Sequence, residues 1–270
     1  MTDTASMRER VPAQSVIEEL LRRQDAAPPR SFLTRLFGRS PLLADNVPWY
    51  VSAQGEIHVG AILAQLPPEW ATFHALPIGT QSADIDHLVV GPGGIFTINT
   101  KHHGGTVIRL GKDSMLVNGR PEPHLLNAEA EAARVTTLLR ERMPLLPPVQ
   151  PVIALVEPRQ IVIDEKPAQV KVVDARQLPR WLSGLSVTLS EPELDEVVDI
   201  LDDPATWPLT GLGAPAWSAD ELMRKFAALD AQVQRARARR VAWTIVACAA
   251  LAALTGMTLS HAAMGGVIAG

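Results

Sequence analysis

The stretch that decides the fold runs from Asp84 to Lys101 and reads DIDHLVVGPGGIFTINTK. Two apolar runs, rich in β-branched residues, flank the turn sequence GPGG. Glycine and proline clusters of this kind mark tight turns, and β-branched and aromatic residues on either side favour strands. The stretch therefore predicts a β-hairpin, with one strand over 84–90 and the other over 95–101.

Polar residues occupy positions on both strands where the pattern alone predicts apolar ones. Asp84 and Asp86 are two residues apart, so both side chains leave the same face of the first strand. Asn99 and Lys101 have the same spacing on the paired strand. Glu56 lies near the start of a helix that is predicted before the hairpin. We expect these side chains to form one polar site.

Carboxylates beside a lysine suggest a site that binds a hard cation and cleaves phosphodiester bonds. Mg²⁺ prefers oxygen ligands and usually keeps several waters. A bound ion would polarise the scissile phosphate and help to generate hydroxide. A lysine at the edge of such a site would orient the water or neutralise charge in the transition state. The expected cofactor is Mg²⁺, with Mn²⁺ as its substitute.

Further elements on both sides of the hairpin follow from hydrophobic periodicity and turn residues. They are helices over 13–25, 54–66 and 125–143, a strand over 71–77, short strands over 106–110 and 115–117, strands over 152–156, 160–163 and 170–173, and a helix from a capping box at Ser190 to about 201. Helices and strands that alternate in this way predict an α/β fold.

The hairpin and its surroundings resemble a known family. Gly55 with Glu56, the string DIDHLVVGPGG, the string NTK and the alanine- and glutamate-rich helix that follows are similar to the NERD (nuclease-related domain) family, over roughly 52–143. That family is similar to the PD-(D/E)xK nucleases. The resemblance implies a restriction-endonuclease-like α/β core, in which a mixed central sheet is flanked by helices. It also implies a helical acid at Glu56, a metal-binding aspartate at Asp86 and a catalytic lysine at Lys101.

The sequence departs from the superfamily motif at one position. The motif has an acid two residues before the lysine, where this chain has Asn99. An amide oxygen can bind Mg²⁺ but carries no negative charge to offset dehydration of the ion. The expected metal ligands are therefore Asp86 and Asn99, with Asp84 and Glu56 as further candidates. The alternative function is a catalytically inactive module that binds nucleic acid or protein on the nuclease fold.

Composition limits the other classes of function. The chain of 270 residues is 47% hydrophobic and 20% charged, which is ordinary for a packed globular protein. Its net charge of −4 argues against indiscriminate binding to long duplex DNA, although nucleic acid remains the expected partner. The single cysteine, Cys248, allows neither an intramolecular disulfide nor a cysteine-based zinc site.

The C-terminal sequence predicts a membrane anchor. Residues 241–270 contain no Asp, Glu, Lys or Arg, and the apolar run over 241–259 follows directly on the arginine-rich segment 235–240. Apolar length and a basic flank are typical of a single transmembrane helix with its basic side in the cytoplasm. A buried core helix is the alternative. Apolar residues at helical spacing over 222–233 could form a homodimer seam, but two heptads are too few for a coiled coil, so packing against the domain is the preferred interpretation.

The expected organisation has five parts. An N-terminal helix and irregular arm occupy 1–51, the nuclease-related domain 52–201, a linker and juxtamembrane helix 202–240, the transmembrane helix 241–259, and a short tail 260–270. The N-terminus has no apolar stretch typical of a secretory signal, so we expect a single-pass membrane protein whose main domain faces the cytoplasm.

Overall fold

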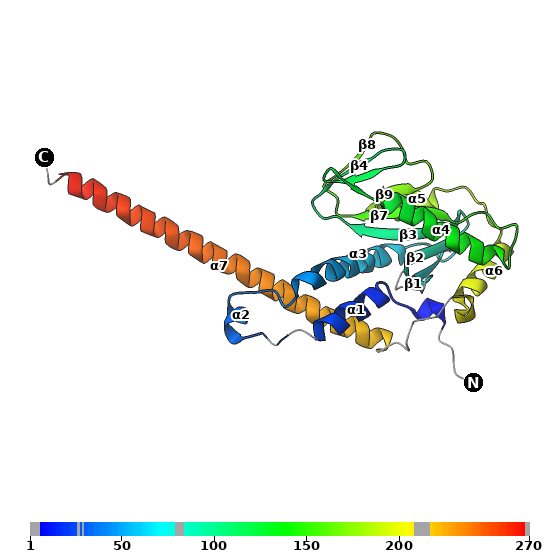
Figure 1. Cartoon of the computed structure of the whole chain (residues 1–270), viewed down its shortest axis with the longest axis horizontal. Coiled ribbons are helices and arrows are strands. Elements are labelled where there is room, and N and C mark those ends of the chain that lie inside the picture. Colours follow the sequence, from blue (N-terminus) through cyan, green and yellow to red (C-terminus); the bar gives the residue numbers. More distant parts are fainter. Residues whose placement is uncertain (1–5, 26–27, 29, 79–83, 208–216, 268–270) are drawn as a thin grey trace. The chain divides into compact units, whose positions relative to one another are not determined.

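The computed structural model describes residues 6–25, 28, 30–78, 84–207 and 217–267, the last of these as backbone alone for most residues beyond 253. The chain divides into two compact units, which we call the sheet unit and the helical unit (Figure 1). The sheet unit comprises Met1–Leu20 and Pro48–Leu222, and the helical unit comprises Leu21–Val47 and Met223–Gly270.

The sheet unit is built on a five-stranded mixed sheet with the order β1-β2-β3-β7-β9. Its strands are β1 (Ala71–Pro77), β2 (Asp84–Gly91), β3 (Gly94–His102), β7 (Gln150–Val156) and β9 (Lys171–Asp174). The first three pair antiparallel, and β3, β7 and β9 pair parallel. The predicted hairpin is confirmed as β2 and β3, with Gly91 opposite Gly94. Gly94 has a φ of 127°, which only glycine adopts readily.

A second sheet, which the sequence analysis did not separate from the first, has the order β6-β5-β4-β8. Its strands are β4 (Val107–Leu110), β5 (Met115–Val117), β6 (Arg120–Glu122) and β8 (Gln160–Ile163). Asn118 and Gly119 both have positive φ between β5 and β6, as a two-residue hairpin turn requires. Ile108, Leu110 and Met115 bury this sheet against the start of the following helix.

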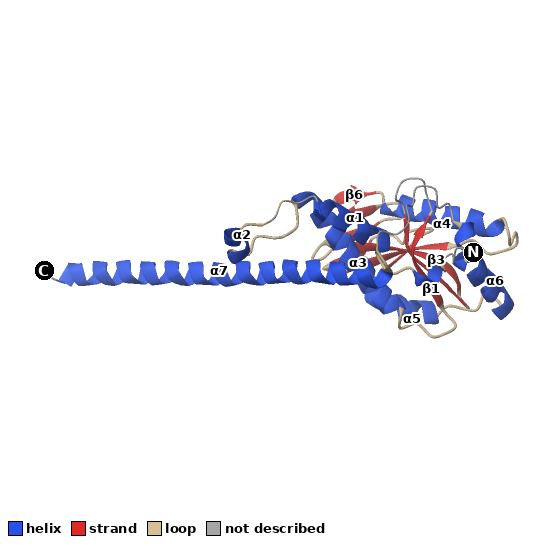
Figure 2. Ribbon diagram, turned by 90° about the horizontal axis from the view of Figure 1, so that it is seen from below, coloured by secondary structure: helices blue, strands red, loops and turns tan. Residues whose placement is uncertain are grey.

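Helices cover both faces of the five-stranded sheet. They are α3 (Val47–Leu63), α4 (His124–Arg140), α5 (Leu178–Ser183) and α6 (Glu191–Asp202). Successive side chains of a strand point to opposite faces. Val89 packs in one apolar cluster with α3 and α5, whereas Val90 packs in another with α4 and α6. Helices α4 and α5 accordingly lie on opposite sides of the strands (Figure 2). The expected core of a mixed sheet flanked by helices is confirmed.

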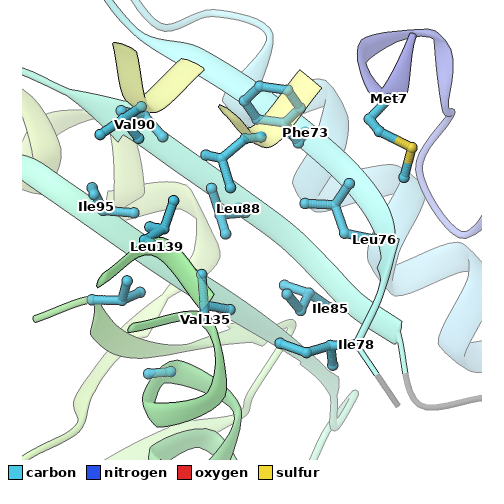
Figure 3. Close-up of a cluster of buried hydrophobic side chains, with 14 of the residues drawn as sticks. Met7, Phe73, Leu76, Ile78, Ile85, Leu88, Val90, Ile95, Val135 and Leu139 are labelled. Atoms are coloured by element: carbon cyan, nitrogen blue, oxygen red, sulfur yellow. The ribbon is translucent and has the colours of Figure 1, made fainter. Parts of the chain in front are cut away.

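The cluster between α4 and the sheet shows how this helix is fixed. Val135 and Leu139 of α4 lie over Leu88, Val90 and Ile95 of the hairpin strands (Figure 3). All five side chains are at most 3% exposed. Burial of each such side chain contributes roughly 1.5–3 kcal/mol to the stability of the fold. The packing of this face of α4 against β2 and β3 is therefore strongly favoured.

The helix before the hairpin is longer than predicted. Helix α3 begins at Val47 rather than near Gln54. Pro48 is acceptable there, because the first turn of a helix needs no backbone N–H from it. The capping box predicted at Ser190 is confirmed, since the Ser190 N–H donates to the Glu193 carboxylate at 2.8 Å. Helix α5 was not predicted.

The helical unit contains α2 (Phe32–Leu36), the end of α1 (Gln14–Asp25) and most of α7 (Ala219–Val267). The Ser218 hydroxyl accepts a hydrogen bond from the Glu221 N–H at 3.3 Å, which caps the N-terminus of α7. Leu222, Phe226 and Leu229 are buried within the single chain, as the packing interpretation of the 222–233 pattern expects.

The transmembrane helix predicted over 241–259 lies only partly within the residues whose side chains are described, so it stays a prediction. Among the described residues, no helix is both long and apolar enough to cross a membrane. The side chains of the apolar run are described without a gap only over 241–253, and a span needs about 20 apolar residues. Extending the stretch toward the N-terminus brings in the arginines of 235–240. The location of the main domain stays a prediction.

Candidate active site

Asp86 is held in place by the neighbouring strand. It lies on β2 with its side chain half-buried, and its Oδ2 accepts a hydrogen bond from the backbone N–H of Thr100 on β3 at 2.7 Å. Burial raises the pKa of Asp86 above its ordinary value, whereas the Lys101 ammonium and the Thr100 N–H oppose this rise. The carboxylate is thus fixed at the surface of the sheet and has a cation near it.

Lys101 stands among several acids. It lies near the end of β3, half-buried, beside Leu155 of the parallel strand β7. Its charge acts on the carboxyl groups of Asp86, Glu56 and Glu131 and lowers the pKa of each relative to burial alone. One lysine therefore stabilises the ionised forms of three buried or half-buried acids, which come from three different elements.

Glu56 approaches this group from α3. Its side chain is 3% exposed, and its Oε1 accepts a hydrogen bond from the Ser52 hydroxyl one helical turn earlier at 3.1 Å. Burial, followed by repulsion from Asp86, raises the pKa of Glu56 well above its ordinary value. The structure thus brings together Glu56, Asp86 and Lys101, the three residues for which catalytic roles were expected.

Glu131 on α4 belongs to the same group and was missed by the sequence analysis. The Asn99 Nδ2 donates to the Glu131 Oε2 at 3.0 Å. Burial, followed by repulsion from Asp86, raises the pKa of Glu131 to about 8. A signal was present in the sequence, because Glu131 lies between the buried Ala128 and Ala132 on the apolar stripe of its helix. An acid at such a position requires a polar partner.

Asp84 has a different environment from Asp86. Its Oδ2 lies 3.9 Å from the Arg10 guanidinium, and the Ser15 hydroxyl donates to the same carboxyl group. Burial raises the pKa of Asp84, against the opposing effects of Ser15 and Arg10. Its charge still acts on Glu56 and Asp86. Arg10 therefore competes with any metal ion for this expected ligand.

The comparison with family models matches this part of the chain. The model of the NERD family, the nuclease-related domain, matches residues 52–156. These residues form a nuclease-related domain. No curated protein and no solved structure matches the chain.

The residues of the site lie inside the nuclease-related domain. The matched residues run from early α3 to the end of β7 and include Glu56, Asp86, Asn99, Lys101 and Glu131. Arg10 and Ser15, the partners of Asp84, lie outside the match. The family match thus contains the whole group of acids around the lysine and excludes the N-terminal arm that neutralises Asp84.

The oxygen atoms of the nuclease-related domain fit a hard cation in their chemistry. Asn99 Oδ1 and Glu131 Oε1 are buried and accept no hydrogen bond, which is costly for polar atoms unless a further partner binds them. Within the described residues, however, no three His, Cys, Asp or Glu side chains are grouped so that they could hold a metal ion. The amide oxygen of Asn99 and water would have to complete the ligands that Asp86 and Glu131 provide.

Two histidines stand near Lys101 of the nuclease-related domain. The rings of His103 and His124 lie 5.5 Å apart, and the Nε2 of each is buried without a hydrogen-bond partner. Burial, followed by the Lys101 charge, lowers the pKa of His103, and the same causes lower that of His124 to about 4. Both rings are therefore neutral at neutral pH. His87 is buried away from this group and contacts His74, with 2.8 Å between the two Nδ1 atoms.

Proposed function

We propose that this protein is a divalent-metal-dependent nuclease that hydrolyses phosphodiester bonds of DNA or RNA. The observation that carries the proposal is the group of three acids around Lys101 inside the nuclease-related domain. Such a group has three acids but one cation, and an added Mg²⁺ or Mn²⁺ would stabilise the ionised forms of the acids. Nucleic acid is the substrate class that this domain type suggests.

Asp86, Asn99 and Glu131 are the residues that would hold the ion. Asp86 supplies a half-buried carboxylate that is held by the Thr100 N–H. Asn99 and Glu131 supply the two buried oxygens that lack a hydrogen bond. When bound, the ion supplies Lewis-acid activation of the phosphate and a lowered pKa of its water.

Lys101 and Glu56 shape the electrostatics around the substrate. The Lys101 ammonium stabilises the negative charge that develops on the phosphate oxygens in the transition state. The raised pKa of Glu56, caused first by burial, favours its protonated form. A protonated Glu56 adds no second negative charge beside Asp86, so the attraction between Asp86 and Lys101 persists. Ser52 holds the Glu56 carboxyl group in this orientation.

A second candidate function rests on the Asn99–Glu131 contact. This hydrogen bond occupies the position where the superfamily motif has a metal-binding acid, and it gives both residues a partner without a metal. A catalytically inactive domain that binds nucleic acid or protein would keep this contact for stability. It predicts no metal-dependent turnover in any variant.

The test is cleavage of plasmid DNA, single-stranded DNA and single-stranded RNA by the full chain, with Mg²⁺, with Mn²⁺ and with EDTA. We expect wild-type cleavage that requires a divalent ion and is lost in Asp86→Ala and Lys101→Ala. Glu129→Gln is the matched control, because Glu129 lies on α4 near Glu131 but makes no bond to Asn99. Equal cleavage by wild type, Asp86→Ala and Lys101→Ala would remove both residues from the mechanism.

A further inference from the structure

A second polar site lies in the helical unit, apart from the residues of the nuclease-related domain. It is a hollow of about 280 Å³ between the segment around α2 and α7. Its lining residues are Arg30, Arg35, Gln232, Arg235, Ala236 and Arg239. We call it the arginine pocket. Four of its six lining residues are arginines, drawn from two segments that are far apart in sequence.

In the part of the chain that the structure describes, the arginines of the pocket are not balanced by acids. Among the described residues, none of the four forms an ion pair with a carboxylate. Burial, followed by the charges of Arg35 and Arg239, lowers the pKa of Arg30. Guanidinium groups that repel one another in this way are stabilised by an anion between them.

The walls of the arginine pocket are held by hydrogen bonds to neutral groups. Arg30 donates from Nη1 to the Arg39 carbonyl at 3.2 Å and from Nη2 to the Gln232 Oε1 at 2.9 Å. Arg239 donates from Nη1 to the Arg35 carbonyl at 2.9 Å. A guanidinium has five N–H donors, so these bonds orient each group and leave other donors for a ligand.

Close packing fixes the two walls against each other. Gly38 has a φ of 70°, and a Cβ added there would lie 2.5 Å from the Ala236 carbonyl oxygen and 2.7 Å from the Arg240 nitrogen. The Trp243 indole N–H donates to the Leu36 carbonyl at 2.9 Å, and its ring lies 5.3 Å from that of Phe37. Glycine at this position therefore lets the loop after α2 pack closely on α7, which makes the pocket a built feature of the fold.

We propose that the arginine pocket binds a phosphate group through its guanidinium groups. A planar guanidinium donates two parallel hydrogen bonds to phosphate oxygens, and several such groups match a dianion. The phosphate can belong to a phospholipid headgroup or to a soluble ligand. Phe32 and Phe37, on the segment that carries Arg35, are 76% and 54% exposed, so apolar surface is also present on this segment. This proposal is independent of the nuclease activity.

The test measures both sources with the full-length chain. Isothermal titration with inorganic phosphate and with pyrophosphate tests the soluble ligand. Co-sedimentation with phosphatidylcholine vesicles that contain phosphatidic acid, against vesicles with the same content of phosphatidylserine, tests a lipid phosphomonoester. The variants are Arg235→Gln and Arg239→Gln. Arg237→Gln is the matched control, because it removes the same charge from the same helix at an exposed position that does not line the pocket.

We expect each pocket variant to weaken binding by about tenfold or more, the size of a lost charge-assisted hydrogen bond, and the control to change it less than about threefold. Binding in the titration assigns the site to soluble phosphate, and binding to the phosphatidic acid vesicles alone assigns it to a lipid headgroup. Both outcomes support the proposal. An equal loss in Arg237→Gln, or no binding by wild type in either arm, would overturn it. Circular dichroism of each variant checks that the helices are retained.

Discussion

The acidic group around Lys101 and the arginine pocket are each built mainly from ionisable residues of one kind. In the sheet unit, Glu56, Asp86 and Glu131 share one lysine. In the helical unit, four arginines line one hollow and none is ion-paired to a carboxylate in the described part of the chain. A divalent cation would stabilise the ionised forms of the acids in the first site, and a phosphate group would neutralise the arginines of the second.

The two sites also tolerate their charges by different means. Carboxyl groups can take up a proton when burial makes the charge costly, and the pKa of Glu131 is accordingly raised to about 8, mainly by burial. Guanidinium groups stay charged at neutral pH and here donate hydrogen bonds to carbonyl oxygens instead. The protonation of the acidic group should therefore change with pH near neutrality, whereas the arginines of the pocket should stay charged.

The largest effect is expected at Asp86 and Lys101. Asp86→Ala or Lys101→Ala alone should lower metal-dependent cleavage by about 100-fold to 1,000-fold, because each removes a charge that acts on the same phosphate. The double variant should lose little more than either single variant, since residues that act as a unit are not additive. Single-turnover cleavage at saturating Mg²⁺ measures this. Losses that multiply in the double variant would show that the two residues act separately.

The next effect concerns pH and the stability of the metal-free protein. Glu131 has a pKa of about 8 in the folded chain and an ordinary value of 4.5. As pH rises, the unfolded chain therefore loses this proton before the folded chain does. The stability that the proton contributes is fully present below about pH 4.5, falls as pH rises, and is lost above about pH 8. Glu131→Gln should remove this loss, which we expect to be about 2–4 kcal/mol.

Urea unfolding in EDTA between pH 5 and 8.5 measures the difference. The variant and wild type should be similarly stable near pH 5, and the variant should be the more stable at pH 8.5. Glu129→Gln, a matched change on the same helix, should keep the wild-type profile. If Glu131→Gln also keeps it, the Glu131 carboxyl group does not carry the pH dependence.

A smaller effect is expected at Gly38, which shapes the arginine pocket without carrying charge. Gly38→Ala places a Cβ against the Ala236 carbonyl oxygen and requires alanine at a positive φ. The loop after α2 should open more readily by about 1–2 kcal/mol, so hydrogen exchange at the Phe37 amide should become about 5–30 times faster. Gly105→Ala is the control, since Gly105 also has a positive φ of 73° but nothing lies within 4 Å of its added Cβ. If the two variants speed hydrogen exchange equally, each in its own loop, the change results from the positive φ alone.

Much of the nuclease-related domain could be predicted from local sequence. The GPGG turn, the alternation on β2 and β3, and the positions of Asp86 and Lys101 follow from strand periodicity, because their partners lie on adjacent strands. Glu56 followed from the family resemblance. The positions of these residues depend on segments that are close together in the sequence, so a sequence pattern can predict them.

The remaining features depend on contacts between distant segments. Glu131 meets Asn99 only because α4 packs over the hairpin, and Arg10 meets Asp84 only because the N-terminal arm reaches β2. The arginine pocket joins Arg35 to Arg239, and neither position is unusual within its own segment. The transmembrane helix predicted over 241–259 stays a prediction, because the side chains of that run are described without a gap only over 241–253.

The central claim is that the acids around Lys101 hold one divalent ion, and isothermal titration of the full chain with Mn²⁺ tests it most directly. We predict a single site in wild type, no site in Asp86→Ala, weakened binding in Glu131→Gln and unchanged binding in Glu129→Gln. Asn99→Asp should strengthen binding, because it adds a charged ligand beside Glu131. Identical binding curves for wild type, Asp86→Ala and Glu131→Gln would contradict the claim.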